Sequence, residues 1–315
     1  MTTRITRSPA VAARFIREGA LAAFPTETVY GLGADAFNEK AIRKIFAAKG
    51  RPSDNPLIVH VADTSQIERL VTRIPPSAVR FMDAFFPGPL TLILPKRKEV
   101  SLLITAGLST VGVRMPSLPL TQKFLHDCGT PVVAPSANRS GNPSPTTLQA
   151  VMSDLQGRIA CILKGGQTIV GLESTVVDCT GTVPKILRAG ALSLEQLRKV
   201  VPATRVARDT GSRSSKSPGM KYRHYAPQAR VVIIDSPADI PTSSDGGYIG
   251  TIELSLRHRL RLVKVCLNVE DYAHALFLFF RRCDEAKVRT IYAQSVSEAG
   301  LGLALMDRIR RAAHR

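Results

Sequence analysis

The residues that could do chemistry gather in four short polar segments. Each segment holds small hydroxyl, amide or cationic side chains beside an apolar run that predicts a strand or the end of a helix. Ligands of α/β proteins bind at the carboxyl ends of strands, so these segments are candidate binding loops, although each alone is also typical of a polar turn. The segments are residues 25–31, 49–56, 134–141 and 171–176.

Cations in and near these segments indicate phosphate or carboxylate binding. Lys49 and Arg51 lie in one turn that prolines restrict on both sides of Asn55. At the end of a predicted helix such cations can serve only the helix dipole, but in one rigid turn they also suit a phosphate clamp. Arg114 and Arg188 each end a predicted strand, where a guanidinium can hold a carboxylate or a phosphate.

Other nucleotide and hydrolase signatures are absent or lie in the wrong context. Residues 31–36 match the dinucleotide pattern G-x-G-x-x-A, and Asp54 lies at a suitable distance. A NAD site is disfavoured, because the glycines follow a polar stretch and the next helix is predicted to begin at Asn38. The sequence has no G-x-x-x-x-G-K-S/T and no G-x-S-x-G motif, which excludes a P-loop and the usual serine-hydrolase elbow. His60 interrupts an apolar strand, where a lone histidine is more often a core residue than a ligand.

The charge balance favours a polyanionic partner. The chain of 315 residues fits about two domains and has 43 Lys and Arg against 25 Asp and Glu, a formal net charge of +18. This excess suits nucleotides, RNA or an anionic membrane surface, but a solvated basic face explains it equally well. Charge therefore indicates partners and does not select a reaction.

The cysteine pattern predicts a reduced, cytoplasmic protein without a metal site. Five cysteines are scattered without C-x-x-C spacing, which favours buried free thiols, and the six histidines are equally dispersed. We see no signal peptide, and the longest apolar stretch, residues 275–280, is too short to span a bilayer. No membrane partner is expected.

Alternating apolar runs and helical patterns predict an α/β sheet domain in the first 200 residues. Ser8 and Asn38 are predicted N-caps of the first two helices. The other predicted helices are 75–86 and 193–200, and the predicted strands are 20–24, 56–61, 90–94, 110–115, 131–134, 159–163, 175–179 and 185–188.

A change of composition predicts a linker and a second domain. Residues 210–218 are rich in Ser, Gly and basic residues without apolar periodicity. We expect a catalytic domain at 1–203, a linker or active-site flap at 204–230 and a smaller α/β domain at 231–315. In that domain the predicted strands are 231–234, 248–251, 262–265 and 288–292, and the predicted helices are 272–285 and 303–313.

Taken together, the motifs resemble the threonylcarbamoyl-AMP synthase family, whose catalytic module is the YrdC-like domain. The resemblance lies in residues 25–33, 49–60, 136–138 and 171–176. The linker sequence SPGMKYRHYAP at 217–227 resembles the long, two-domain branch, and Gly300 to Ala304 with Asp307 and Arg308 resemble its C-terminal domain. The resemblance implies a twisted mixed-sheet YrdC-like domain with helices and a smaller, Rossmann-like C-terminal α/β domain.

The resemblance also implies a reaction and its partners. A nucleotidyltransferase of this family joins L-threonine, bicarbonate or CO2, and ATP with its Mg²⁺ into threonylcarbamoyl-AMP and pyrophosphate. A tRNA-threonylcarbamoyl-transferring complex then modifies tRNA, and direct contact with tRNA is left open. The main alternative is a non-catalytic tRNA- or RNA-binding protein, which would have no reason to respond to threonine. A NAD-dependent enzyme is a more distant alternative.

Carried over residue by residue, the resemblance implies two sets of binding residues and no metal bound by protein side chains. The reaction requires positioning and stabilisation of phosphate charge, so we assign no catalytic nucleophile or general base. The implied L-threonine ligands are Thr28, His60, Arg114, Ser136 and Ser174. The implied ATP ligands are Lys49, Arg51, Asn55, Thr110, Asn138, Thr146 and Arg188, with His224 and Tyr225 of the linker closing over the nucleotide.

Overall fold

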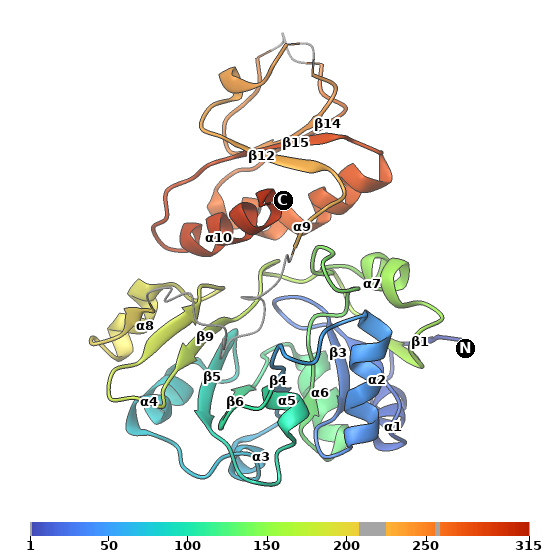
Figure 1. The fold of residues 1–315 in the computed structure, drawn as a ribbon, viewed down its shortest axis with the longest axis vertical. Coiled ribbons are helices and arrows are strands. Elements are labelled where there is room, and N and C mark those ends of the chain that lie inside the picture. The colour runs from blue at the N-terminus through green and yellow to red at the C-terminus, as the bar shows by residue number, and fades with distance from the viewer. Residues whose placement is uncertain (1, 208–224, 243, 256–258, 315) are drawn as a thin grey trace.

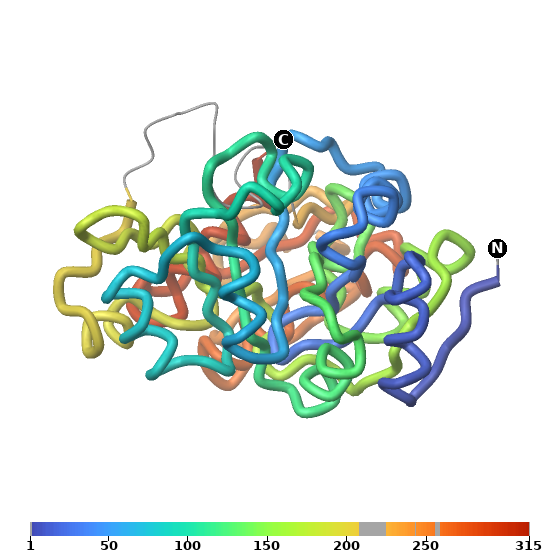
Figure 2. Tube along the Cα trace, turned by 90° about the horizontal axis from the view of Figure 1, so that it is seen from below, coloured from blue at the N-terminus to red at the C-terminus, as the bar shows by residue number. Residues whose placement is uncertain are grey.

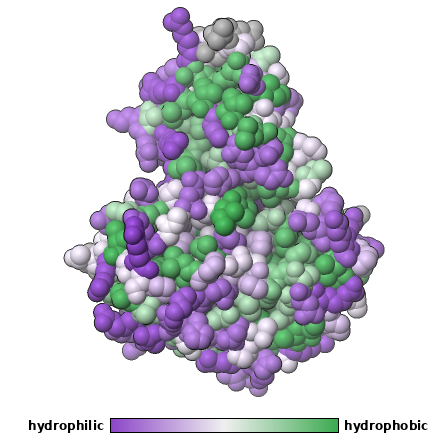
Figure 3. Space-filling model, turned by 180° about the vertical axis from the view of Figure 1, so that it is seen from behind, coloured by the Kyte–Doolittle hydropathy of each residue, from purple (hydrophilic) through white to green (hydrophobic). Residues whose placement is uncertain are grey.

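The chain forms a larger and a smaller α/β body, stacked along the long axis of the molecule (Figure 1). The computed structural model describes residues 2–207, 225–242, 244–255 and 259–314. Seen from below, the blue and green segments of the larger body lie in front of the orange and red smaller body (Figure 2). The space-filling view shows the narrowing between the two bodies (Figure 3).

Strands of the larger body form one mixed sheet, in the order β1-β8-β2-β3-β7-β4-β6-β5-β9-β10-β11 within the described residues. The sheet contains both parallel pairs, such as β4 with β6, and antiparallel pairs, such as β5 with β6, which confirms the predicted mixed sheet. The strands are β1 (Arg4–Thr6), β2 (Ala22–Phe24), β3 (Gly31–Asp35), β4 (Ile58–His60), β5 (Leu90–Pro95), β6 (Thr110–Arg114), β7 (Val132–Val133), β8 (Cys161–Leu163), β9 (Thr175–Asp178), β10 (Lys185–Arg188) and β11 (Arg205–Val206).

Both predicted N-caps are confirmed. The side chain of Ser8 accepts a hydrogen bond from the backbone N–H of Val11, and that of Asn38 accepts one from Ala41. Each cap satisfies a backbone donor that a helix start leaves free. The helices of the larger body are α1 (Pro9–Arg17), α2 (Glu39–Lys49), α3 (Thr64–Glu68), α4 (Pro76–Phe85), α5 (Leu102–Thr105), α6 (Pro119–Cys128), α7 (Leu148–Leu155) and α8 (Leu194–Val200).

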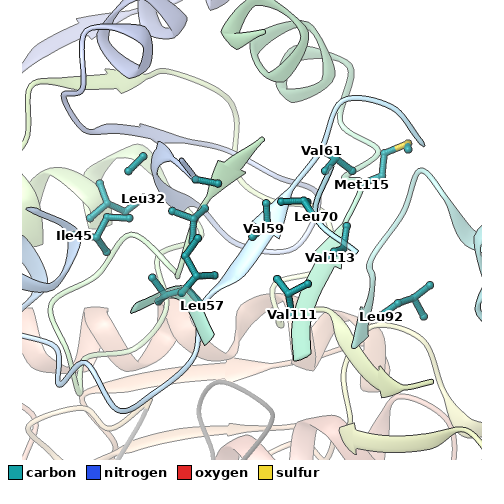
Figure 4. Packing of buried hydrophobic residues seen from close by; sticks show 14 of the residues in the cluster. Leu32, Ile45, Leu57, Val59, Val61, Leu70, Leu92, Val111, Val113 and Met115 are labelled. Atoms are coloured by element: carbon teal, nitrogen blue, oxygen red, sulfur yellow. The ribbon is translucent and has the colours of Figure 1, made fainter. Parts of the chain in front are cut away.

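The core of the larger body is mainly aliphatic. Every residue of β4 and β6 is buried, and side chains such as Val59, Val111 and Val113 pack together in the centre of Figure 4. Branched aliphatic residues suit a pleated surface that is covered on both faces. These strands therefore form a rigid base for the polar residues at their ends.

The G-x-G segment forms a strand rather than a phosphate-binding turn. Gly31 and Gly33 lie in β3, which pairs with β2 and β7. A Cβ atom on Gly33 would lie 2.8 Å from a methyl group of Val132 and 3.0 Å from the ring of Phe24. The glycines thus permit close packing between strands, and their lack of side chains is the reason that the sequence analysis missed β3.

The smaller body is a parallel sheet with two helices on one face. Its strands lie in the order β12-β15-β13-β14 in the part of the chain that the structure describes. The helices α9 and α10 lie between this sheet and the larger body (Figure 1). The elements are β12 (Arg230–Ile234), the short 3-10 helix η1 (Pro237–Asp239), β13 (Gly247–Gly250), β14 (Leu262–Val265), α9 (Val269–Glu285), β15 (Thr290–Gln294) and α10 (Gly302–Ala313).

Several expectations about the whole chain can be compared with these elements. All five cysteines are buried and free, as predicted. Strand β11 extends the first sheet to Val206, slightly beyond residue 203, and the domain limits 1–203, 204–230 and 231–315 stay predictions. No helix in the described ranges is long and apolar enough to cross a membrane.

Candidate functional site

A cavity of about 680 Å³, including its solvent-open mouth, lies where the binding loops meet. All four polar segments contribute side chains, together with the ends of β4, β6 and β10. The lining residues are Thr26, Val29, Tyr30, Gly31, Arg51, Pro56, Leu57, Ile58, His60, Arg114, Ala134, Pro135, Ser136, Asn138, Asn142, Ser144, Glu173, Ser174, Arg188 and Tyr225.

The structure brings residues from both predicted ligand sets to this cavity. The predicted residues that line it are Arg51, His60, Arg114, Ser136, Asn138, Ser174, Arg188 and Tyr225. A second group is buried without lining the cavity: Thr28, Lys49, Asn55, Thr110 and Thr146. His224 lies outside the described residues.

Arg114 is fixed by a buried ion pair at the end of β6. Its Nη2 atom lies 2.7 Å from Oε1 of Glu27, and both side chains are almost fully buried. The other carboxylate oxygen of Glu27 accepts a hydrogen bond from the backbone N–H of Ser117. Arg114 Nε is buried without a hydrogen-bond partner. The guanidinium is thus held in place while one of its donors stays available for an acceptor.

His60 lies beside Arg114, because β4 and β6 pair in register. Its ring packs edge-on against Phe24, with centroids 5.8 Å apart, and its Nδ1 atom has no hydrogen-bond partner. Burial, with a contribution from the charge of Arg114, lowers the pKa of His60 to about 3. The imidazole is therefore neutral at physiological pH.

Lys49 shapes the third binding loop from behind. Its Nζ atom donates hydrogen bonds to the backbone carbonyls of Ser136 and Asn138. Burial, with a further contribution from the charge of Arg51, lowers the pKa of Lys49 well below its usual value. The side chain of Asn138 in turn donates to the carbonyls of Arg139 and Asn142. This network presents the hydroxyl of Ser136 and the amide of Asn138 at the cavity.

Arg51 is anchored at one end and open at the other. Its Nη2 atom donates to the carbonyls of Asn55 and Pro56 at 3.3 and 3.1 Å, whereas Nε is buried without a partner. Burial lowers the pKa of Arg51 to about 10, so the group stays cationic at neutral pH. Arg51 therefore presents a positive charge to the cavity.

Arg188 and Ser174 form a connected pair in the cavity wall. Nη2 of Arg188 donates to the carbonyl oxygen of Ser174 at 2.9 Å and to its hydroxyl at 3.2 Å. That hydroxyl also lies 2.8 Å from the hydroxyl of Thr91. Burial lowers the pKa of Arg188. With Arg51 and Arg114, this residue gives the cavity three guanidinium groups, which suits anionic ligands.

Sequence reasoning assigned no role to several lining residues. The hydroxyl of Tyr30 donates to the carbonyl of Gly166 at 3.1 Å. Glu173 accepts a hydrogen bond from the hydroxyl of Ser144 and forms an ion pair with Arg308 of helix α10. Arg308 is 135 residues away in the chain, so no local motif could reveal the pair.

The unpartnered polar atoms at this site favour ligand binding. Buried polar groups are normally hydrogen-bonded, and an exception calls for an explanation. Arg51 Nε, His60 Nδ1 and Arg114 Nε all belong to cavity-lining side chains. Across the described ranges, no group of three or more His, Cys, Asp or Glu side chains is placed to hold a metal ion.

Comparisons with known proteins cover nearly the whole chain. A family model described as "Telomere recombination" matches residues 14–190, and another described as "Threonylcarbamoyl-AMP synthase, C-terminal domain" matches residues 192–314. The chain is 45% identical to the threonylcarbamoyl-AMP synthase of Pyrococcus abyssi, over 96% of this chain and 93% of that protein. It is also 45% identical to that of Bacillus subtilis, over 96% of this chain and 92% of that protein.

A solved structure agrees with the fold of both bodies. The P. abyssi Sua5 protein complexed with L-threonine aligns with a TM-score of 0.91 at 43% sequence identity. The alignment covers 99% of this chain and 97% of that chain. The match confirms the predicted fold class.

Proposed function

This chain belongs to the threonylcarbamoyl-AMP synthase family, and on that premise we propose how its cavity performs the family's reaction. The chain is an enzyme of the nucleotidyl-transfer type that serves tRNA modification. We infer that it joins L-threonine, bicarbonate or CO2, and ATP into threonylcarbamoyl-AMP, with pyrophosphate as the other product. The observation that carries this proposal is the set of unpartnered nitrogen atoms on Arg51, His60 and Arg114 in one cationic cavity.

The threonine half of the site is built around Arg114. A guanidinium held by Glu27 suits the threonine carboxylate, and the neutral imidazole of His60 adds no charge that would repel the amine. Ser136 and Ser174 offer hydroxyl groups from two other loops. Thr28 lies behind the cavity, with its hydroxyl 2.8 Å from that of the lining residue Thr26, so its part is to orient Thr26.

The ATP half is built around Arg51 and Arg188. Their guanidinium groups suit the phosphates, and MgATP, rather than a metal held by the protein, is the substrate that we expect. Among the remaining predicted ligands, Lys49 positions the loop that carries Asn138. Tyr225 covers the cavity from the second domain's side. The remaining proposed nucleotide ligands are Asn55, Thr110, Thr146 and His224.

The chemistry follows from positioning. The neutral amine of threonine attacks CO2 and, with loss of one proton to solvent, forms a carbamate. A carbamate oxygen then forms a bond to the α-phosphorus of ATP, while the bond from that phosphorus to the leaving oxygen breaks and pyrophosphate departs with the electron pair. Fixed guanidinium groups stabilise the negative charge that develops on the phosphates, and no protein nucleophile takes part.

We place this reaction in the cytoplasm, upstream of a complex that transfers the threonylcarbamoyl group to tRNA. The adenylate is an activated mixed anhydride, so an acceptor must consume it before water does. A closing segment at 204–230 would serve the same end by excluding water.

Pyrophosphate release is the direct test of the function. We expect release from MgATP that requires both L-threonine and bicarbonate, and that L-valine, which lacks the hydroxyl group, supports poorly. Folded protein that binds tRNA but releases no pyrophosphate in response to threonine would favour the non-catalytic RNA-binding alternative and contradict the proposal.

A further inference from the structure

We propose that Arg308, on the last helix of the second domain, is a positioning residue for the nucleotide wall of the cavity. The proposal rests on the function proposed above and assigns the second domain a direct part in it. Arg308 is 0% exposed and extends from α10 into the boundary between the two bodies.

One side chain reaches three separate segments. Its Nε atom donates to Oε2 of Glu173 at 2.8 Å, and its Nη2 atom donates to the backbone carbonyl of Ala189 at 2.9 Å. The guanidinium also lies over the ring of Tyr225, 5.2 Å from its centroid. Asp307, the neighbouring residue on α10, accepts a hydrogen bond from Nη1 and fixes the guanidinium on its own side.

Each of the three segments contributes a cavity-lining residue. Glu173 and Tyr225 line the cavity themselves, and Ala189 directly follows Arg188. The guanidinium is planar and rigid. Contacts at its Nε atom, at its Nη2 atom and on its face therefore fix the spacing of the three segments that it joins. Arg308 therefore sets the distance between Arg188 and Tyr225, both on the proposed nucleotide side.

Electrostatics make this arrangement dependent on the arginine. Burial raises the pKa of Glu173, but the charges of Arg308 and Arg188 and a hydrogen bond from Ser144 outweigh burial and hold the pKa below its usual value. A buried carboxylate that loses its cation is left uncompensated and takes up a proton or moves. Loss of Arg308 would thus alter Glu173 and, through it, the Ser144 side of the cavity.

Helix α9 supports the same boundary at two more points. The ring of Tyr225 stacks on that of Phe277, with centroids 5.4 Å apart. A Cβ atom on Gly171 would lie only 2.5 Å from Cα of His274, so the loop before Glu173 packs directly on the helix backbone. The second domain is thereby in firm contact with the segments that Arg308 joins.

The threonine side of the cavity is held independently of Arg308. Arg114, the anchor of that side, is fixed by Glu27 within the first domain. Ser174 follows Glu173 and is hydrogen-bonded to Arg188, so it is the one threonine-side residue that shares the wall joined by Arg308. A defect at Arg308 should therefore affect the two substrates unequally. A merely structural role, which would lower the amount of folded enzyme, would not change either KM.

The test compares wild type with Arg308→Lys. Lysine keeps the charge beside Glu173, but one ammonium group cannot also contact Ala189 and cover the Tyr225 ring. We expect the KM for ATP, and the Kd for MgATP measured by calorimetry, to rise about tenfold, as for the loss of one well-formed contact. The KM for L-threonine should stay within about twofold. The melting temperature should fall by a few degrees, because the partly buried carbonyl of Ala189 loses its donor, but the variant should remain folded at the assay temperature.

A matched control lies two residues further along α10. Arg310 forms an exposed ion pair with Glu298, with 47% of its side chain accessible, so Arg310→Ala should leave both KM values unchanged. Glu173→Gln is the second variant, because it keeps the shape of the side chain and removes the charge that Arg308 neutralises. Because Arg308→Lys keeps the charge beside Glu173, Glu173→Gln tests the contact that the lysine variant leaves in place, and it alone should also weaken MgATP binding.

The outcomes separate this inference from the proposed function. An unchanged KM for ATP in Arg308→Lys, equal changes for both substrates, or an unchanged Kd for MgATP in Glu173→Gln would each overturn the role of Arg308. Absence of threonine-dependent pyrophosphate release from wild type would overturn the proposed function instead. The MgATP Kd of the variants would still decide the case for Arg308.

Discussion

The two sheets of this protein end in opposite ways. In the larger sheet, the ends of β4 and β6 present His60 and Arg114, each with a buried nitrogen that has no partner. In the smaller sheet, the end of β15 presents Gln294, whose Oε1 atom accepts hydrogen bonds from the hydroxyl of Tyr248 and from the backbone N–H groups of Thr251 and Ile252. Both are carboxyl ends of strands in an α/β sheet, where ligands usually bind.

The difference shows that the fold alone does not make a binding site. Strand ends whose polar groups hydrogen-bond to one another stabilise the domain. Strand ends with unpartnered polar atoms can gain free energy from a ligand. We therefore expect substitutions at the strand ends of the larger sheet to affect the reaction, and substitutions at the strand ends of the smaller sheet to affect stability. Effects on the reaction should be largest at Arg51 and Arg114, the cations whose Nε atoms have no hydrogen-bond partner.

Arg51→Ala should give the largest effect. Arg51 Nε is unfilled and its charge faces the proposed phosphates, so we expect kcat/KM for ATP to fall about 100- to 1000-fold, the range for loss of one charge-stabilising donor. Steady-state pyrophosphate release measures it. Arg43→Ala is the control, because Arg43 lies on the neighbouring helix α2 with 66% of its side chain exposed. Unchanged kinetics in Arg51→Ala would remove Arg51 from the site and weaken the comparison.

The strand ends and binding loops of the larger sheet could be predicted well because their sequence patterns are local. Helix caps such as Ser8 and Asn38 and the apolar runs of the strands lie within a few residues, so most strands and the capped helices were found. The helices α3, α5, α6 and α7 were not predicted. The binding loops are contiguous motifs, and many of their residues line the cavity. Strand β3 was missed because its glycines carry no apolar pattern.

Long-range pairs could not be predicted from the sequence alone. Glu27 and Arg114 are separated by 87 residues, and Glu173 and Arg308 by 135 residues. A pairing of this kind depends on how the sheet and the second domain are placed, and no spacing rule encodes it. The same limit applies to the closed network around Gln294, because its partners come from another strand and the loop after it.

Gln294→Leu tests the strand ends of the smaller sheet. The change removes the acceptor of two partly buried backbone N–H groups, those of Thr251 and Ile252, so the free energy of unfolding should fall by about 2 kcal/mol. Urea denaturation followed by circular dichroism measures it, with Leu267→Ala, at a side chain that is 93% exposed, as the control. Both KM values should match those of wild type. A selective rise in either KM would show that the strand ends of the smaller sheet also serve the reaction.

The neutral His60 predicts a particular dependence of stability on pH. Its pKa is about 3 in the folded protein, against an ordinary value of about 6.5 in the unfolded chain. As pH falls below about 6.5, the unfolded state binds a proton that the folded state does not, so stability is lost progressively down to about pH 3.

Between pH 7.5 and pH 5, this single group should cost about 2 kcal/mol of unfolding free energy. Urea denaturation at both pH values, on wild type and His60→Gln, isolates the contribution. The decrease should be smaller by that amount in the variant. Equal decreases in the two proteins would mean that His60 is protonated in the folded state at pH 5. The strand ends of the larger sheet would then carry one more charge at that pH than proposed.

Ser174→Ala should give the smallest effect, for the reason that defines the comparison. The hydroxyl of Ser174 already contacts Thr91 and Arg188, so a ligand gains at most one further neutral hydrogen bond from it. We expect kcat/KM for L-threonine to fall about fivefold to tenfold, equivalent to about 1 kcal/mol. Thr91→Val, which removes only a partner of Ser174, should cost less than Ser174→Ala in the same pyrophosphate assay. A loss at Ser174 as large as that at Arg51 would mean that filled and unfilled groups contribute alike, and the number of unpartnered atoms would then be no guide to where this protein binds its substrates.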